Sequence, residues 1–388
     1  MGDGTLGGSA APAFDERALE DCATRNPSRF GFAEAARRRL SDKSDRILVG
    51  SRRQGINAKV ISRSDFVWGC AALVAALPSA ARAEAGRGAW SLAAPLPTER
   101  SEDSVAAIGT VLYVVGGYVP AGPNPKFLEV NGRADVDGAL VQAYDAVANA
   151  WQQRASLPSG LNHIGVVEFG GKLFTFGGFE RQNRGAVADA NVYDAAADRW
   201  APIAPVPTRR GSIAVAALGA NIHLVGGRDE HSVGTHDVYD VAANTYASAR
   251  PLPIGRDHMG LIAFDGHLYA IAGRIDDFDH NTSFVDMYDP ATDAWAALAA
   301  MPSQRSGMAV AVYRDQIFAL GGERRGGTFT NNEAFDPRLN TWGVFAPLPE
   351  GRHGTGAVVI RDAIYLPAGG PVNGGSRQST TLYVFRLD

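Results

Sequence analysis

The sequence predicts an all-β fold, a β-propeller with six blades, and three observations lead to this prediction. Glycine and proline are both abundant, at 45 and 21 of 388 residues, which favours short strands and turns over helices. A pair of small residues recurs six times, at intervals of 46 to 61 residues, and a large aromatic residue recurs with the same rhythm. The small pairs occupy positions 116–117, 177–178, 226–227, 272–273, 321–322 and 369–370. The aromatic residues are Trp90, Trp151, Trp200, Tyr246, Trp295 and Trp342.

Each repeat has room for four short strands, as the unit from Met301 to Trp342 illustrates. A strand of small residues is expected over 306–313, followed by a turn and a second strand over 316–322, whose paired glycines permit close backbone approach. A third strand over 332–336 and a further turn lead into a fourth strand that starts at Trp342. Four strands in a period of about 48 residues make one propeller blade, and the small residues of the first strand suit a crowded axis.

The repeats resemble those of the kelch family, which carry Gly-Gly, Tyr-Asp and Trp at this spacing. The Tyr-Asp pair or its equivalent stands at 144–145, 193–194, 239–240, 288–289 and 335–336. The resemblance covers residues 90–388 and implies a six-bladed propeller of kelch repeats. The Gly-His and Trp-Asp marks of the WD40 propellers are missing at the required spacing.

The two ends of the repeat region complement each other. Residues 381–388 supply the third strand of the sixth blade, and no aromatic strand follows them. A spare strand that starts at Trp90 lies at the other end of the repeats. We expect this N-terminal strand to become the outer strand of the last blade, which closes the ring and covers the edge of the blade.

The segment before the repeats has the layout of a secretory signal. A basic stretch precedes an apolar run from Phe66 to Leu77, and Ala81-Arg82-Ala83 then offers an A-x-A cleavage site. We therefore divide the chain into residues 1–59, either disordered or an extension upstream of the true start, a signal-peptide-like segment at 60–83, and the propeller at 84–388. This predicts a periplasmic or secreted bacterial protein. An internal hydrophobic helix is the alternative interpretation of the apolar run.

Composition excludes several classes of protein. The net charge of −4 gives no electrostatic reason to expect binding to nucleic acid. No apolar run reaches the roughly 18 residues that a membrane span needs. Both cysteines, Cys22 and Cys70, precede residue 84, so the tyrosine–cysteine copper chemistry of galactose oxidase-like kelch proteins is not expected. We expect a monomer without a cofactor.

A repeated Pro-x-x-Arg motif lies in the connection from each blade to the next, and a Leu161 replaces the arginine in blade two. Six-fold placement would arrange these arginines around the mouth of the central channel, where they could bind an anion. The alternative is purely structural, with each guanidinium bonded to loop carbonyls. We assign as ligand-binding these arginines, their neighbour His353 and two residues of the loops after the small pairs: Arg100, Arg210, Arg256, Arg305, Arg352, His353, Arg228 and Arg274.

Two residues after that arginine position, three repeats carry small residues and three do not. The exceptions are Glu102, His163 and His258, in blades one, two and four. A glutamate with two histidines around one axis could bind a metal ion or act in acid–base catalysis. We assign the three as candidate catalytic residues and no metal site. Ordinary polar loop residues are the alternative.

Two functions from different classes fit these features. The first is an exported binding module whose top-face loops and arginine ring bind an anionic small molecule, a glycan or a peptide of a protein partner. The second follows from the resemblance, because sialic acid mutarotases are six-bladed kelch proteins that need no metal. In that case Glu102 with His163 or His258 would transfer protons, and Arg256 and Arg305 would bind the sugar carboxylate. A eukaryotic-type adaptor is a third possibility, which the export signal disfavours.

Overall fold

The computed structural model describes residues 87–120, 128–130 and 133–388. The extension predicted at 1–59 and the signal-like segment at 60–83 lie outside the described residues. Among the residues that are described, helical structure is limited to one short 3-10 turn, η2 (Phe278–His280). No helix in this part of the chain is long and apolar enough to cross a membrane.

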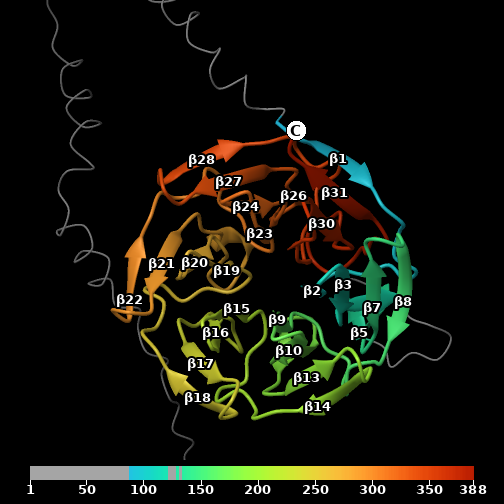
Figure 1. The fold of residues 1–388 in the computed structure, drawn as a ribbon, viewed down its shortest axis with the longest axis horizontal. Coiled ribbons are helices and arrows are strands. Elements are labelled where there is room, and N and C mark those ends of the chain that lie inside the picture. The colour runs from blue at the N-terminus through green and yellow to red at the C-terminus, as the bar shows by residue number, and fades with distance from the viewer. Residues whose placement is uncertain (1–86, 121–127, 131–132) are drawn as a thin grey trace, which may run out of the picture. The chain divides into compact units, whose positions relative to one another are not determined.

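Six four-stranded antiparallel sheets surround a central axis, as the six-bladed prediction requires (Figure 1). Blades one and two consist of β2 (Ser104–Ile108), β3 (Val111–Val115), β7 (Val141–Asp145) and β8 (Ala150–Arg154), then β9 (Gly165–Phe169), β10 (Lys172–Phe176), β13 (Ala190–Asp194) and β14 (Arg199–Pro202). Blades three and four consist of β15 (Ala214–Leu218), β16 (Asn221–Val225), β17 (His236–Asp240) and β18 (Thr245–Ser248), then β19 (Gly260–Phe264), β20 (His267–Ile271), β21 (Val285–Asp289) and β22 (Ala294–Ala297). Blade five consists of β23 (Ala309–Tyr313), β24 (Gln316–Leu320), β27 (Asn332–Asp336) and β28 (Thr341–Val344).

The sixth blade confirms the predicted closure. Its strand order is β1 (Ala89–Leu92), β31 (Leu382–Arg386), β30 (Ile364–Pro367) and β29 (Val358–Val359). The first strand of the propeller therefore pairs with the last, with Trp90 opposite Phe385 in antiparallel register. Figure 1 shows β1 beside β31 on the outside of the ring. Each blade thus has four strands, and the ring closes without a covalent link.

The connections between the second and third strands carry additional small sheets. They form a three-stranded sheet of β4 (Tyr118–Pro120), β6 (Arg133–Asp137) and β5 (Leu128–Val130) in blade one, and two hairpins, β11 (Phe179–Arg181) with β12 (Arg184–Ala186) and β25 (Glu323–Arg324) with β26 (Gly327–Thr328). These loops share one face of the propeller with the blade-to-blade connections, and we call it the top face.

Aromatic and turn residues that recur in the repeats join each blade to the previous one. In blade two, the Tyr193 hydroxyl donates to Asp198 (2.5 Å), and the same carboxylate accepts from the backbone N–H of Ala155 in the preceding connection (2.9 Å). The Trp200 indole N–H donates to the Ala155 carbonyl (2.9 Å). In blade three Tyr246 replaces the tryptophan and its hydroxyl donates to the equivalent carbonyl of Ala204 (2.9 Å). The repeated tyrosine and tryptophan therefore join neighbouring blades, whereas the aspartate of the Tyr-Asp pair accepts from the turn N–H groups of Ala196 and Ala197 in its own blade.

The small pairs allow the blades to approach closely on the top face. Gly178 donates its N–H to the carbonyl of Arg210 in the next blade (3.1 Å), and a Cβ on Gly177 would lie 2.2 Å from that oxygen. In blade six the residues in this conformation are Ala368 and Gly369, with φ of 55° and 77°. The sequence-based assignment of the pair to 369–370 was therefore shifted by one residue, because consecutive glycines hid the correct register.

Candidate functional site at the propeller axis

Six equivalent residues form a backbone ring around the axis, one from each blade. Each lies two positions after the arginine site, and each has a left-handed φ between 51° and 63°. Backbone N–H groups donate to carbonyl oxygens of the neighbouring blade along most of this ring, at 2.8 to 3.1 Å. Glycine adopts this conformation without strain, whereas a larger residue does so at a cost of about 1 kcal/mol or more. The ring residues are Glu102, His163, Ser212, His258, Gly307 and Gly354.

The arginines of the Pro-x-x-Arg motif do not line the channel mouth. Arg256 is fully buried, pairs with Asp286 (2.7 Å) and donates to the carbonyl of Ala272 (2.8 Å) in its own blade. Two further arginines also have a buried acidic partner, Asp237 for Arg210 and Glu333 for Arg305. Arg100 donates to three backbone carbonyls and to Gln142, and Arg352 pairs with Glu350.

Burial and these bonds correct the expectation of an anion-binding arginine ring. All five arginines are at most 1% exposed. Four of them, Arg100, Arg210, Arg256 and Arg305, turn into the blade, where carbonyls at the end of the second strand need donors that the strand pairing does not provide. Arg352 bonds instead to Glu350 and to the Tyr383 hydroxyl. The geometry supports the structural interpretation of the motif, and we assign no ligand to these five residues.

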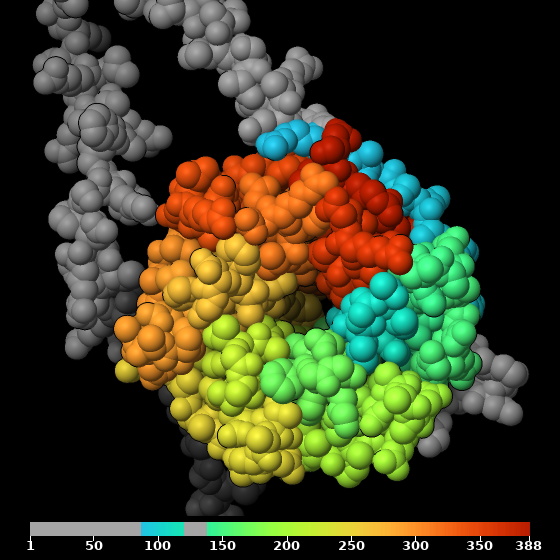
Figure 2. Space-filling model, in the orientation of Figure 1, coloured from blue at the N-terminus to red at the C-terminus, as the bar shows by residue number. Residues whose placement is uncertain are grey.

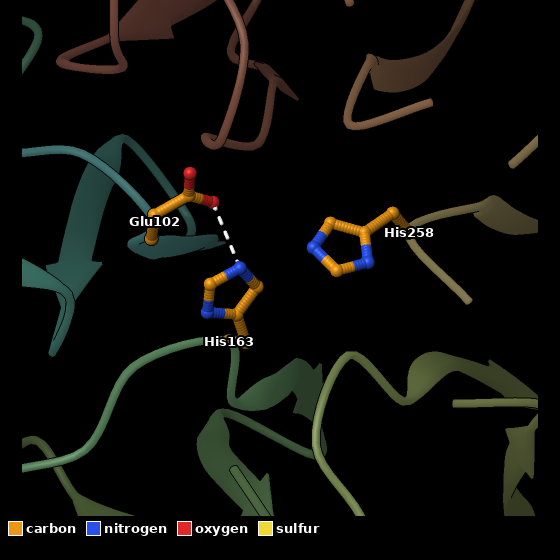
Figure 3. A group of neighbouring side chains, drawn as sticks. All are labelled: Glu102, His163 and His258. Carbon is orange, nitrogen blue, oxygen red and sulfur yellow. Dashed lines mark ion pairs between the residues drawn. The ribbon is translucent and has the colours of Figure 1, made fainter. Parts of the chain in front are cut away.

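The three ring residues with large side chains meet at the axis. Glu102, His163 and His258 come from blades one, two and four, and each offers a ligand atom within 4.8 Å of the other two (Figure 3). The Glu102 carboxylate pairs with His163 Nε2 at 3.0 Å. All three side chains are nearly buried, with at most 6% of the side chain exposed. The channel is therefore narrow enough for side chains from three different blades to meet. We call these three residues the axial triad.

Both histidines of the triad are oriented by the residue that precedes them. His163 Nδ1 lies 2.5 Å from the amide oxygen of Asn162, and His258 Nδ1 bonds to the Asp257 carboxylate. On His258 the acceptor at Nδ1 places the proton there and leaves Nε2 to accept from Arg274. His163 has an acceptor beside each ring nitrogen, Asn162 at Nδ1 and Glu102 at Nε2. Figure 3 shows the Nε2 edges of both rings pointing towards the carboxylate of Glu102.

A second group of charged residues surrounds the triad. Arg274 donates to Asp257 (3.3 Å), to Glu323 (3.0 Å) and to His258 Nε2 (2.8 Å). His353 Nδ1 lies 3.2 Å from Glu323 and 3.5 Å from Glu102, and its Nε2 bonds to the Val372 carbonyl (2.7 Å). Of the predicted ligand-binding residues, Arg274 and His353 therefore join the triad. Arg228 does not, because it donates to the carbonyls of Asp276 and Glu230 in the loops.

Burial and neighbouring charges shift the acid–base properties of this cluster. Burial alone would raise the pKa of Glu102, but His163 and His353 outweigh it and hold the carboxylate well below its usual range. Burial, with the charge of Arg274, lowers the pKa of His258 to about 4, so its ring is neutral at pH 7. Burial raises the pKa of Asp103 to about 7 against the attraction of Arg100.

Two neighbouring cavities share lining residues near the axis, and the triad lines the smaller one. The smaller has a volume of about 130 Å³ and is lined by the triad together with Ser212 and Thr355. The larger, about 400 Å³, follows the inner strands of the blades and is mostly walled by small aliphatic residues. Asp103 and Ser104 line both cavities. Figure 2 shows the hollow at the centre of the ring of blades.

Asp103, Asn162, Asp257 and Glu323 were not assigned to the site from the sequence. The sequence contained a signal for three of these residues. In each repeat, the residue after the arginine position forms a β-bridge with the residue after the small pair. Those pairings include Asn162 with Phe179, Asp257 with Arg274 and Ser306 with Glu323. Alignment of these two columns would have placed the polar residues beside the axis.

Comparison with known proteins identifies the repeats. The family model described as the KLHDC2/KLHL20/DRC7 Kelch-repeats domain matches residues 166–370. Kelch-like protein terF of Aspergillus terreus is 31% identical over 81 residues, which are 21% of this chain and 16% of that protein. Kelch-like protein 25 of Homo sapiens is 35% identical over 95 residues, 23% of this chain and 14% of that protein. The matches thus span less than a fifth of the length of these relatives.

Among solved structures, YjhT is similar to this chain with a TM-score of 0.62 and 14% sequence identity. The likeness covers 77% of this chain and 98% of YjhT. At this identity the likeness concerns the fold alone.

Proposed function

Because this chain belongs to the kelch-repeat family, we propose that it is a binding module that holds a small polar molecule in the central channel, against the axial triad. One observation carries the proposal. In three blades the left-handed conformation of the ring is adopted by Ser212, Gly307 and Gly354. The fold therefore does not need a glutamate and two histidines at the same position of the other blades. Large residues held in a strained conformation at the end of a cavity indicate a function that the strain serves.

The dimensions of the channel support a small molecule over a glycan chain or a peptide. The cavity at the triad is about 130 Å³ and the adjoining one about 400 Å³, whereas pockets for drug-sized ligands measure roughly 300–1,000 Å³. Aliphatic walls and a charged end suit a molecule with one polar side. An anionic ligand receives less support, because the five arginines of the Pro-x-x-Arg motif are buried and bond to groups of the protein itself.

Mutarotation of an acidic sugar is the alternative. The Glu102–His163 pair could transfer a proton, but Arg256 and Arg305, which the sugar carboxylate would need, are paired with Asp286 and Glu333. We therefore propose binding rather than mutarotation. NMR measurement of anomer exchange, with any acidic sugar that binds, decides between the two.

A thermal-shift screen of the full chain against neutral sugars, sugar acids and small carboxylic acids, in the presence of a chelator, tests the proposal. A ligand that binds the native state raises the melting temperature by mass action. We expect a shift in the wild type that is lost in Glu102→Gln and kept in the control Asp279→Asn, an exposed acid of the top-face loops. An equal shift in all three proteins, or no shift with any compound, would contradict the proposal.

Export is part of the same proposal, on the evidence of the signal-like layout of residues 60–83. Expression of the full chain in a bacterial host, followed by N-terminal sequencing of the exported protein, tests it. Export predicts a mature chain that begins at Glu84. Retention of the intact chain in the cytoplasm would support the alternative of an internal hydrophobic helix.

A further inference from the structure

We infer that the axial triad is the binding site of a divalent transition-metal ion, coordinated by Glu102, His163 and His258. This goes beyond ligand binding, and it holds whether or not a molecule enters the channel. The three ligand atoms lie within 4.8 Å of one another, and one pair is already at 3.0 Å. Ligands of a tetrahedral zinc ion, with bonds of about 2.0–2.2 Å, lie about 3.3 Å apart, so small side-chain movements suffice.

The outer partners of the histidines match those of metal ligands in proteins. A ligating histidine almost always donates its second ring N–H to a carboxylate or carbonyl oxygen, which orients the ring and makes the ligating nitrogen more basic. Asp257 does this for His258 and Asn162 for His163. Asp257 is itself completely buried and held by the Ser232 hydroxyl and by Arg274. The two outer partners come from the same position in two different blades.

The charge balance of the cluster favours a doubly charged cation. Three carboxylates, those of Glu102, Asp257 and Glu323, are at most 5% exposed, and Arg274 is the guanidinium that bonds to two of them. Buried charges require compensation by partners or by a metal. Two negative charges are left for the histidines or a cation to balance. A divalent ion at the triad supplies this charge without protonating the imidazoles.

The donor set indicates the class of ion and the kind of site. Two imidazoles and one carboxylate suit Zn²⁺ or Fe²⁺, whereas Ca²⁺ and Mg²⁺ prefer oxygen ligands. Three protein ligands beside a cavity of about 130 Å³ leave space for a few water molecules or part of a ligand on the ion. Arg274 Nη2 now bonds to His258 Nε2 and would release it to the ion, while it keeps Asp257 and Glu323 as partners.

Titration of the chelator-treated full chain with Zn²⁺ by calorimetry, and with Co²⁺ by visible absorption, tests this inference. We expect one tight Zn²⁺ per chain and ligand-field bands from Co²⁺. His258→Gln and Glu102→Gln should weaken Zn²⁺ binding at least 100-fold, and Asp257→Asn, which acts through His258, about 10- to 100-fold. His231→Gln, which removes an exposed histidine, should leave the affinity unchanged.

Two outcomes would overturn the inference. One is the absence of Zn²⁺ binding to the wild-type chain, a result that does not depend on whether any variant folds. The other is binding that the triad variants retain and His231→Gln loses. Small-molecule shifts that occur in chelator while Zn²⁺ does not bind would refute the metal site and leave the proposed function standing. Zn²⁺ binding without any small-molecule shift would do the reverse.

Discussion

Trp90 and Phe385 pack against each other with ring centroids 5.0 Å apart, and they join the first strand of the propeller to the last. The Trp90 indole also donates to the carbonyl of Ala346 in blade five (2.8 Å). One residue therefore links the closing strand β1 to its own blade and to the preceding one. A ring that closes without a covalent bond depends on such contacts for its stability.

Removal of this contact should destabilise the whole propeller. We expect Trp90→Ala to lower the free energy of unfolding by about 2–3 kcal/mol, since a half-buried aromatic ring and one hydrogen bond are lost. Leu92→Ala is the matched control, because Leu92 lies on the same strand and is 71% exposed. Urea unfolding measures the free energy of unfolding of both variants. Equal stabilities of the two variants, or an unchanged stability after deletion of residues 90–97, would refute the closure.

The buried arginines should matter for folding rather than for binding. Arg256→Met leaves Asp286 buried without its charged partner, which should cost about 3–5 kcal/mol. The exposed pair of Arg325 with Asp279 offers a control, and Arg325→Met should cost less than about 1 kcal/mol. The double change Arg256→Met with Asp286→Leu should recover part of the loss. Normal stability of Arg256→Met with loss of anion binding would restore the binding interpretation of the motif.

A buried histidine pair in blade three should make the propeller sensitive to acid. Burial lowers the pKa of His223 to about 4, and His236 Nε2 lies 2.8 Å from its Nδ1. The unfolded chain binds a proton at about pH 6.5, so stability is complete above that pH and falls as the pH drops towards 4. For this one group the loss between pH 7 and pH 4 is on the order of 3 kcal/mol.

Urea unfolding at several pH values checks this prediction. The wild type should lose more stability than His223→Gln over the same range. Parallel pH profiles of the two proteins would show that His223 does not titrate as described.

Gly354 should be needed for the position of the Glu102 carboxylate. A Cβ on Gly354 would lie 2.6 Å from Glu102 Oε2, whereas a Cβ on Gly109, which also has a left-handed φ, would meet nothing within 4 Å. Both Gly→Ala changes should cost about 1 kcal/mol of stability through backbone strain. Only Gly354→Ala should also weaken Zn²⁺ binding, by at least 10-fold. Calorimetry of the two variants gives the comparison, and equal affinities would count against the triad.

The fold was predictable because its information is local and repeated. The Gly-Gly pair, the tyrosine of Tyr-Asp and the tryptophan each take part in a contact between blades, as Gly178, Tyr193 and Trp200 show, so six copies in register define six blades. The closure of the ring was predictable because the sixth blade lacked a fourth strand and an unassigned strand started at Trp90. The shifted pair in blade six shows the limit of this approach where consecutive glycines leave the register ambiguous.

The site was predictable only in part. Glu102, His163 and His258 were found because they break a column of small residues. The orientation of the arginine side chains was not predictable, because sequence spacing places the backbone of a residue but does not say in which direction its side chain points. Arg256 turns into its blade to Asp286, whereas Arg274 turns to the axis. Those directions depend on which carbonyls and carboxylates the neighbouring strands bring close.

Diffraction from crystals of the protein grown with Zn²⁺, recorded on both sides of the zinc absorption edge, tests most directly whether the axial triad acts as one binding centre. We predict an anomalous peak about 2.0–2.2 Å from Glu102 Oε2 and from the Nε2 atoms of His163 and His258, with Arg274 withdrawn from His258. Peaks confined to exposed histidines such as His231, with the Arg274–His258 bond intact, would contradict the account.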